Sequence, residues 1–120
     1  MCFSLMKNGA MIGMLLFSRL SFAETFEFSS VSGKKLVLTS DDEFFSETSS
    51  GAKLCSDVPT EFKKVKLWMP DHGHGSTPTS LVKIDQYCTR VEKLNFVMSG
   101  NWDFQISFSD GDKASQIVGI

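Results

Sequence analysis

This sequence of 120 residues lacks a long apolar run, a strongly basic segment and any cluster of cysteines. Its longest uncharged apolar stretch covers residues 9–17, whereas a helix that spans a membrane needs about 20 such residues. The formal net charge is −2 and the lysines are spread along the chain. This charge distribution argues against a nucleic-acid partner or an anionic membrane surface.

The sequence also lacks the motifs that enzymes use for nucleophilic or acid–base chemistry. It has no Ser or Cys nucleophile motif, no paired carboxylates and no glycine loop of the kind that holds phosphates. Ser76 follows His74 closely, but no third group is placed to orient such a pair. We therefore expect a protein that is not an enzyme.

The first residues have the pattern of a signal peptide. Lys7 precedes the apolar run, and Ser21 and Ala23 supply small residues at the −3 and −1 positions of a cleavage site before Glu24. The alternatives are an N-terminal membrane anchor or a buried helix, but the apolar run is short for both. The pattern predicts a periplasmic or secreted protein, with no stable membrane span after cleavage.

Cleavage at this site would divide the chain into a signal peptide, residues 1–23, and one domain, residues 24–120. Either Met1 or Met6 would serve as the start. The domain would have 97 residues, with ten basic and fourteen acidic side chains. A domain of this size buries a small core, so additional crosslinks are common.

Two of the three cysteines, Cys55 and Cys88, fall within the predicted domain. In an oxidising compartment an even pair predicts a disulfide, which would add about 3 to 4 kcal/mol through loop entropy. The alternative is a pair of thiolate metal ligands. The two residues lack CxxC-like spacing and do not adjoin the histidines, so we favour the disulfide.

The predicted domain shows alternation at the strand period and almost no helical periodicity. In residues 102–108, for example, Trp102, Phe104 and Ile106 alternate with polar side chains. The runs with strand character are residues 25–29, 35–39, 62–69, 81–88, 93–98, 102–108 and 114–120. Residues 40–56 are rich in Ser, Asp and Glu and are predicted as a loop, with Phe44 and Phe45 as an anchor or a short strand.

About seven antiparallel strands without a repeat favour an all-β fold, an immunoglobulin-like β-sandwich. A true antibody-type domain is not expected. Trp68 and Cys88 are only 20 residues apart, and Tyr87 is adjacent to Cys88 instead of two residues before it.

The segment from Met69 to Pro78 contains both histidines of the chain, His72 and His74, in a glycine-rich loop. Two imidazoles separated by one residue converge on one metal ion if the backbone turns between them. Met69 and Met98 would add soft thioether ligands and so favour copper, especially Cu(I). The carboxylate of Asp71 would instead favour Cu(II) or zinc.

Residue chemistry alone leaves other interpretations of this loop open. A His-Gly-His-Gly connection also serves as a rigid link between strands, with imidazoles bonded to nearby backbone. Met69 and Met98 both fall on predicted core faces, where methionine commonly fills space. A role of the histidines in proton transfer is a third alternative.

Two motifs in this part of the chain resemble the YtkA-like family of small exported domains. The first runs from Met69 to Gly75 and fits MPxxGHG, and the second runs from Phe96 to Trp102 and fits FxMxGxW. The resemblance covers about half of the predicted domain. It implies an immunoglobulin-like sandwich associated in some members with copper-handling or respiratory-oxidase assembly partners. The family positions here are Met69, His74 and Met98.

The sequence thus leads to two hypotheses. In the first, the protein is an exported copper-binding module whose metal ligands are Met69, His72, His74 and Met98. In the second, it is a non-catalytic structural or protein-interaction domain of the cell envelope that binds no metal. Its recognition edge would then be the same loop together with Trp102.

Overall fold

The computed structural model describes residues 23–44 and 49–120. The predicted signal peptide up to residue 22 lies outside this part, as does Phe45. The described residues form nine strands, and no helix among them is long and apolar enough to cross a membrane. The strands are β1 (Thr25–Ser29), β2 (Lys35–Ser40), β3 (Ser49–Ser56), β4 (Phe62–Met69), β5 (His74–Gly75), β6 (Ser80–Lys83), β7 (Cys88–Asn95), β8 (Asn101–Phe108) and β9 (Lys113–Gly119).

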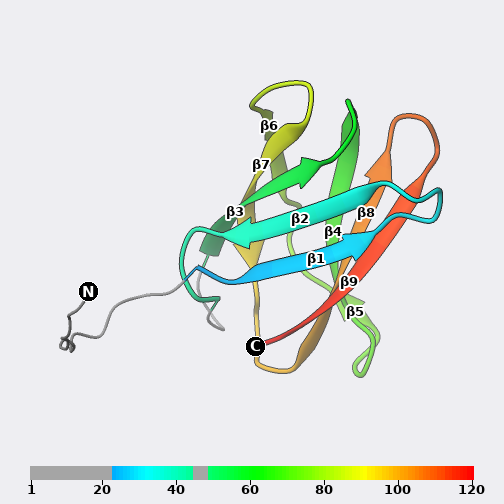
Figure 1. Cartoon of the computed structure of the whole chain (residues 1–120). Coiled ribbons are helices and arrows are strands. Elements are labelled where there is room, and N and C mark those ends of the chain that lie inside the picture. Colours follow the sequence, from blue (N-terminus) through cyan, green and yellow to red (C-terminus); the bar gives the residue numbers. More distant parts are fainter. Residues whose placement is uncertain (1–22, 45–48) are drawn as a thin grey trace, which may run out of the picture.

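The strands pack as two antiparallel sheets, which confirms the all-β, immunoglobulin-like sandwich (Figure 1). The first sheet has five strands in the order β1-β2-β3-β7-β6, and the second has four in the order β5-β4-β8-β9. The β4–β5 hairpin, the β7–β8 connection and the C-terminus lie toward the same end of the sandwich (Figure 1). The candidate metal ligands are therefore at that end.

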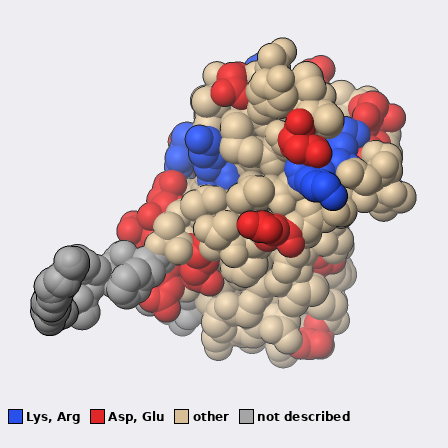
Figure 2. Space-filling model, viewed as in Figure 1, with Lys and Arg blue, Asp and Glu red and all other residues tan. Residues whose placement is uncertain are grey.

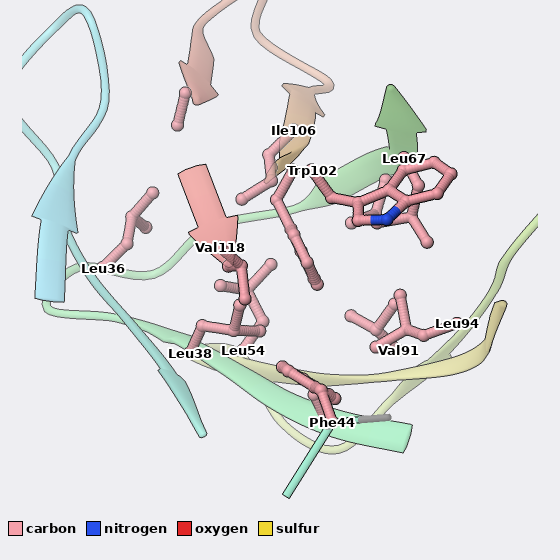
Figure 3. Close-up of a cluster of buried hydrophobic side chains, with 14 of the residues drawn as sticks. Leu36, Leu38, Phe44, Leu54, Leu67, Val91, Leu94, Trp102, Ile106 and Val118 are labelled. Carbon is pink, nitrogen blue, oxygen red and sulfur yellow. The ribbon is translucent and has the colours of Figure 1, made fainter. Parts of the chain in front are cut away.

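The core is built from alternating apolar residues of both sheets that meet in one interior (Figure 3). Leu38, Leu54 and Val91 come from the five-stranded sheet, and Leu67 and Trp102 come from the other; all are buried. Phe44 also lies in this core, with its ring centroid 5.0 Å from that of Phe96. The expected role of Phe44 as an anchor is confirmed.

The predicted loop over residues 40–56 is wrong in its second half, where β3 forms. Its inward side chains are Ala52, Leu54 and Ser56, a weak apolar alternation among many serines. Gly51 lies at an irregularity in the β3–β7 pairing. A Cβ there would lie 2.6 Å from the Arg90 side chain, so glycine leaves room for the ion pair of Arg90 with Asp41.

The predicted strand over residues 81–88 is correct for residues 81–83 but not beyond them, because a turn separates β6 from β7. Asp85 Oδ1 accepts hydrogen bonds from the backbone N–H groups of Tyr87 and Cys88, at 2.8 and 2.9 Å. An aspartate that bonds the backbone ahead of it favours a turn over strand pairing. The predicted strand over residues 93–98 is displaced, since β7 begins at Cys88 and ends at Asn95.

Cys55 and Cys88 form the predicted disulfide. They are direct partners in the β3–β7 ladder, and their side chains are on the outward face of that sheet. The bridge thus joins neighbouring strands of one sheet, whereas antibody-type domains use theirs to join two sheets.

Candidate metal centre

The two histidines lie on the tight β4–β5 hairpin. Met69 and His74 are direct partners in the ladder, and the chain turns between them. The backbone N–H groups of His72 and Gly73 both donate to the Met69 carbonyl, at 3.2 and 2.8 Å. Gly73 has φ +67°, in the left-handed region that glycine adopts without steric cost. The turn therefore brings the histidines onto one short hairpin.

The imidazoles of His72 and His74 lie close together, with ring centroids 5.8 Å apart and ring planes at 35°. Two imidazoles on one ion, each at about 2.0 to 2.1 Å from it, have centroids about 5 to 6.5 Å apart for bond angles from tetrahedral to linear. The observed spacing lies within that range. The spacing of this pair is therefore compatible with a single ion between the two rings.

One nitrogen of His74 is already engaged. Its Nδ1 lies 3.1 Å from the carbonyl oxygen of Gly75, and a carbonyl only accepts. In this contact Nδ1 carries the proton and Nε2 carries the free lone pair. Metal-ligating histidines commonly hold their second nitrogen in this way.

His74 also contacts Trp102, edge to face, with ring centroids 5.9 Å apart. Trp102 is fully buried, and its Nε1–H donates to the carbonyl oxygen of Met98 at 2.9 Å. The expectation that Trp102 forms an exposed recognition edge is therefore wrong. Its indole instead connects the hairpin to the β7–β8 connection.

Met69 packs tightly against the same connection. It is fully buried, and its methyl group lies 2.5 Å from the place where a side chain on Gly100 would begin. Gly100 has φ +137° and exchanges two backbone hydrogen bonds with Ile120, at 3.0 and 2.8 Å. The two sequence motifs thus form one interlocked structure.

The structure places the four predicted ligands unequally. His72 is exposed and His74 is half-buried, and these two are adjacent. Met69 is opposite His74 in register but its thioether is in the core, and Met98 is partly buried against that core. Within the described ranges, no three His, Cys, Asp or Glu side chains gather where they would hold an ion.

The hairpin carries few charges of its own. Residues 69–79 contain one charged side chain, Asp71, and residues 95–102 contain none. On the face in Figure 2, the Lys and Arg side chains lie in the half away from the hairpin. One basic side chain of β4 does lie beside the hairpin, because Lys66 Cε is 3.8 Å from the point where a Cβ on Gly75 would be.

Sequence reasoning missed the residues that support the hairpin. The Ser76 hydroxyl donates to the Asn95 carbonyl at 2.5 Å, which ties the chain after β5 to the other sheet. Ser76 thus has a structural partner. Gly100 is the glycine of the FxMxGxW motif, but the motif does not reveal the methyl group of Met69 that packs against it.

A hollow and a cluster of charged side chains with shifted pKa values lie elsewhere. The hollow has a volume of about 570 Å³ and is lined by residues of β8, β9 and the end of β1, among them Asp103, Gln105 and Lys113. Lys34 donates to Asp110 and Asp112, both at 2.9 Å, and these bonds lower the pKa of Asp110 and raise that of Lys34. None of the predicted ligands belongs to either feature.

Comparison of the chain with protein-family models, curated proteins and solved structures gives no match.

Proposed function

We propose that the protein is an exported, non-catalytic copper-binding module, related to the YtkA-like domains, that acts in the periplasm or outside the cell. The observation that carries this proposal is the pair of imidazoles at 5.8 Å on one short hairpin. His72 and His74 would hold the ion, and copper would supply soft Lewis-acid character there.

Methionine thioethers would complete the ligand set. Met98 is only partly buried, whereas Met69 is sealed in the core, so Met98 would be the easier of the two to bring to an ion. In this proposal Met98 is the first soft ligand to engage, and Met69 joins only if the hairpin shifts. Nitrogen plus thioether ligation favours Cu(I) over hard cations.

Titration of the purified mature domain with Cu(I) and with Cu(II) tests this function. Replacing both histidines, His72→Ala with His74→Ala, should lower the affinity for each ion by more than about 100-fold, because both nitrogen ligands are lost. Gln86→Ala changes an exposed side chain on another hairpin and should leave both affinities unchanged. Unchanged affinity in the double histidine variant would remove the proposal.

The alternative, a structural or protein-interaction domain without metal, is favoured by one observation. Met69 is fully buried and packs against Gly100, so core packing alone accounts for a methionine at this position of the motif. In that case neither copper ion would bind the wild-type domain. The same titration separates the two functions.

A further inference from the structure

Trp102 contacts both an imidazole ligand candidate, His74, and the backbone of a thioether ligand candidate, Met98. Its ring meets the imidazole of His74 at 5.9 Å, and its N–H bonds the backbone of Met98 at 2.9 Å. The ring also lies 6.0 Å, edge to face, from that of Phe96, the first residue of the second motif. One indole thus contacts both the hairpin and the β7–β8 connection.

The bond to Met98 restrains a segment that has no strand pairing of its own. Residues 96–100 lie between β7 and β8, and Val97 within them is 47% exposed. Trp102 holds this segment through the Met98 carbonyl, and Gly100 holds its end through Ile120. A buried indole N–H needs an acceptor, so its only polar atom is committed to fixing Met98.

We propose that Trp102 is a positioning residue that gives the site its preference for Cu(I) over Cu(II), by holding Met98 beside the imidazole of His74. This inference rests on the proposed function. A thioether stabilises Cu(I) far more than Cu(II) or zinc, whereas imidazoles accept all three ions. The position of Met98 therefore changes the affinity for Cu(I) selectively.

Trp102→Phe tests the proposal because it keeps an aromatic ring and removes the N–H. The Cu(I) affinity, measured by competition with a chromophoric chelator, should fall about tenfold, since one buried hydrogen bond fixes the ligand. The Cu(II) affinity should stay within about twofold. Tyr87→Phe is the control, because it removes a polar hydrogen from an exposed aromatic ring on the β6–β7 turn of the other sheet, and it should change neither affinity.

A second variant, Met98→Leu, shows whether Trp102 acts through Met98. Leucine has a similar volume without the sulfur, and the backbone acceptor of Trp102 is kept. This variant should also lose about tenfold in Cu(I) affinity, and adding Trp102→Phe to it should cost little more. Such non-additivity is expected when one residue works through another.

A nuclear magnetic resonance measurement keeps the proposal testable if Trp102→Phe does not fold. In the wild-type protein Cu(I) should shift the Trp102 Nε1–H resonance, and Met98→Leu should abolish that shift. Zn²⁺, which the imidazoles bind alone, should shift it much less. An unmoved resonance would overturn the proposal.

The remaining outcomes distinguish failure of the positioning role from failure of copper binding. Equal losses of Cu(I) and Cu(II) affinity in Trp102→Phe would show general loosening of the hairpin, and additive losses would show that Trp102 does not act through Met98. Either result overturns the positioning role and leaves copper binding intact. A wild-type domain that binds neither ion would instead refute the proposed function itself.

Discussion

At Gly100 a single residue joins three parts of the chain. Its backbone pairs with Ile120, its φ is +137°, and the methyl group of Met69 occupies the space that a side chain would need. The residue thus combines a left-handed conformation with close packing. Each of these requirements alone favours glycine.

Gly100→Ala should lower the free energy of unfolding by about 2 kcal/mol, from backbone strain and displacement of the buried Met69 methyl group. Gly111→Ala is the matched control: φ is +91°, and no atom lies within 4 Å of the added Cβ. Gly111→Ala should lower the free energy of unfolding by at least about 1 kcal/mol less than Gly100→Ala does. Urea unfolding of both variants measures the difference, and equal losses would contradict the packing argument.

Between elements, the β1–β2 turn and the β8–β9 turn are fastened by polar contacts. Asp112 accepts from the backbone N–H of Ser32 at 3.0 Å and from Lys34 Nζ at 2.9 Å. Hydrogen bonds from the hydroxyls of Ser30 and Ser32, and then from Lys34, hold the pKa of Asp112 well below its usual range. The native state therefore binds fewer protons at this group than the unfolded state does.

A lowered carboxyl pKa stabilises the fold above the ordinary pKa of about 4, and this contribution is lost as the pH falls through and below that value. Asp112→Asn should lower Tm by several degrees at pH 7. The difference in Tm between the variant and the wild type should be smaller at pH 3. Thermal unfolding at both pH values checks this, and a gap that stays constant would count against the ionic role of Asp112.

The disulfide is a second connection between elements, linking β3 to β7 at Cys55 and Cys88, 33 residues apart. Replacing both with alanine should lower the free energy of unfolding by about 3 to 4 kcal/mol, because the unfolded chain gains entropy. Copper affinity should not change, since the hairpin lies on the other sheet. A loss below about 1 kcal/mol in urea unfolding would contradict this.

The elements differ in how far the sequence predicts them. The predicted range of β4 is correct at both ends, because its inward Val65 and Leu67 alternate with outward lysines. β3 was missed because Ala52 and Ser56 are small inward residues that leave a weak period-two signal. The β6–β7 turn was missed because Asp85 stops the strand through hydrogen bonds that hydrophobic pattern does not register.

At the scale of the whole molecule, the sandwich brings two distant motifs together. His74 and Trp102 are far apart in sequence but are in contact because β5, β4 and β8 are neighbours in one sheet. The proximity of the two histidines follows from their local spacing, so it was predictable. The burial of Met69 and Trp102 depends on the opposite sheet, so the sequence could not separate a ligand from a core residue there.

X-ray absorption of the mature domain loaded with one equivalent of Cu(I) tests whether the histidine hairpin binds copper. We expect two imidazole nitrogens at about 2.0 Å from the copper together with sulfur at about 2.3 Å. The imidazole signal should be lost in the His72→Ala, His74→Ala variant. A wild-type domain that retains no copper, or a copper shell without imidazole scattering, would refute copper binding at this hairpin.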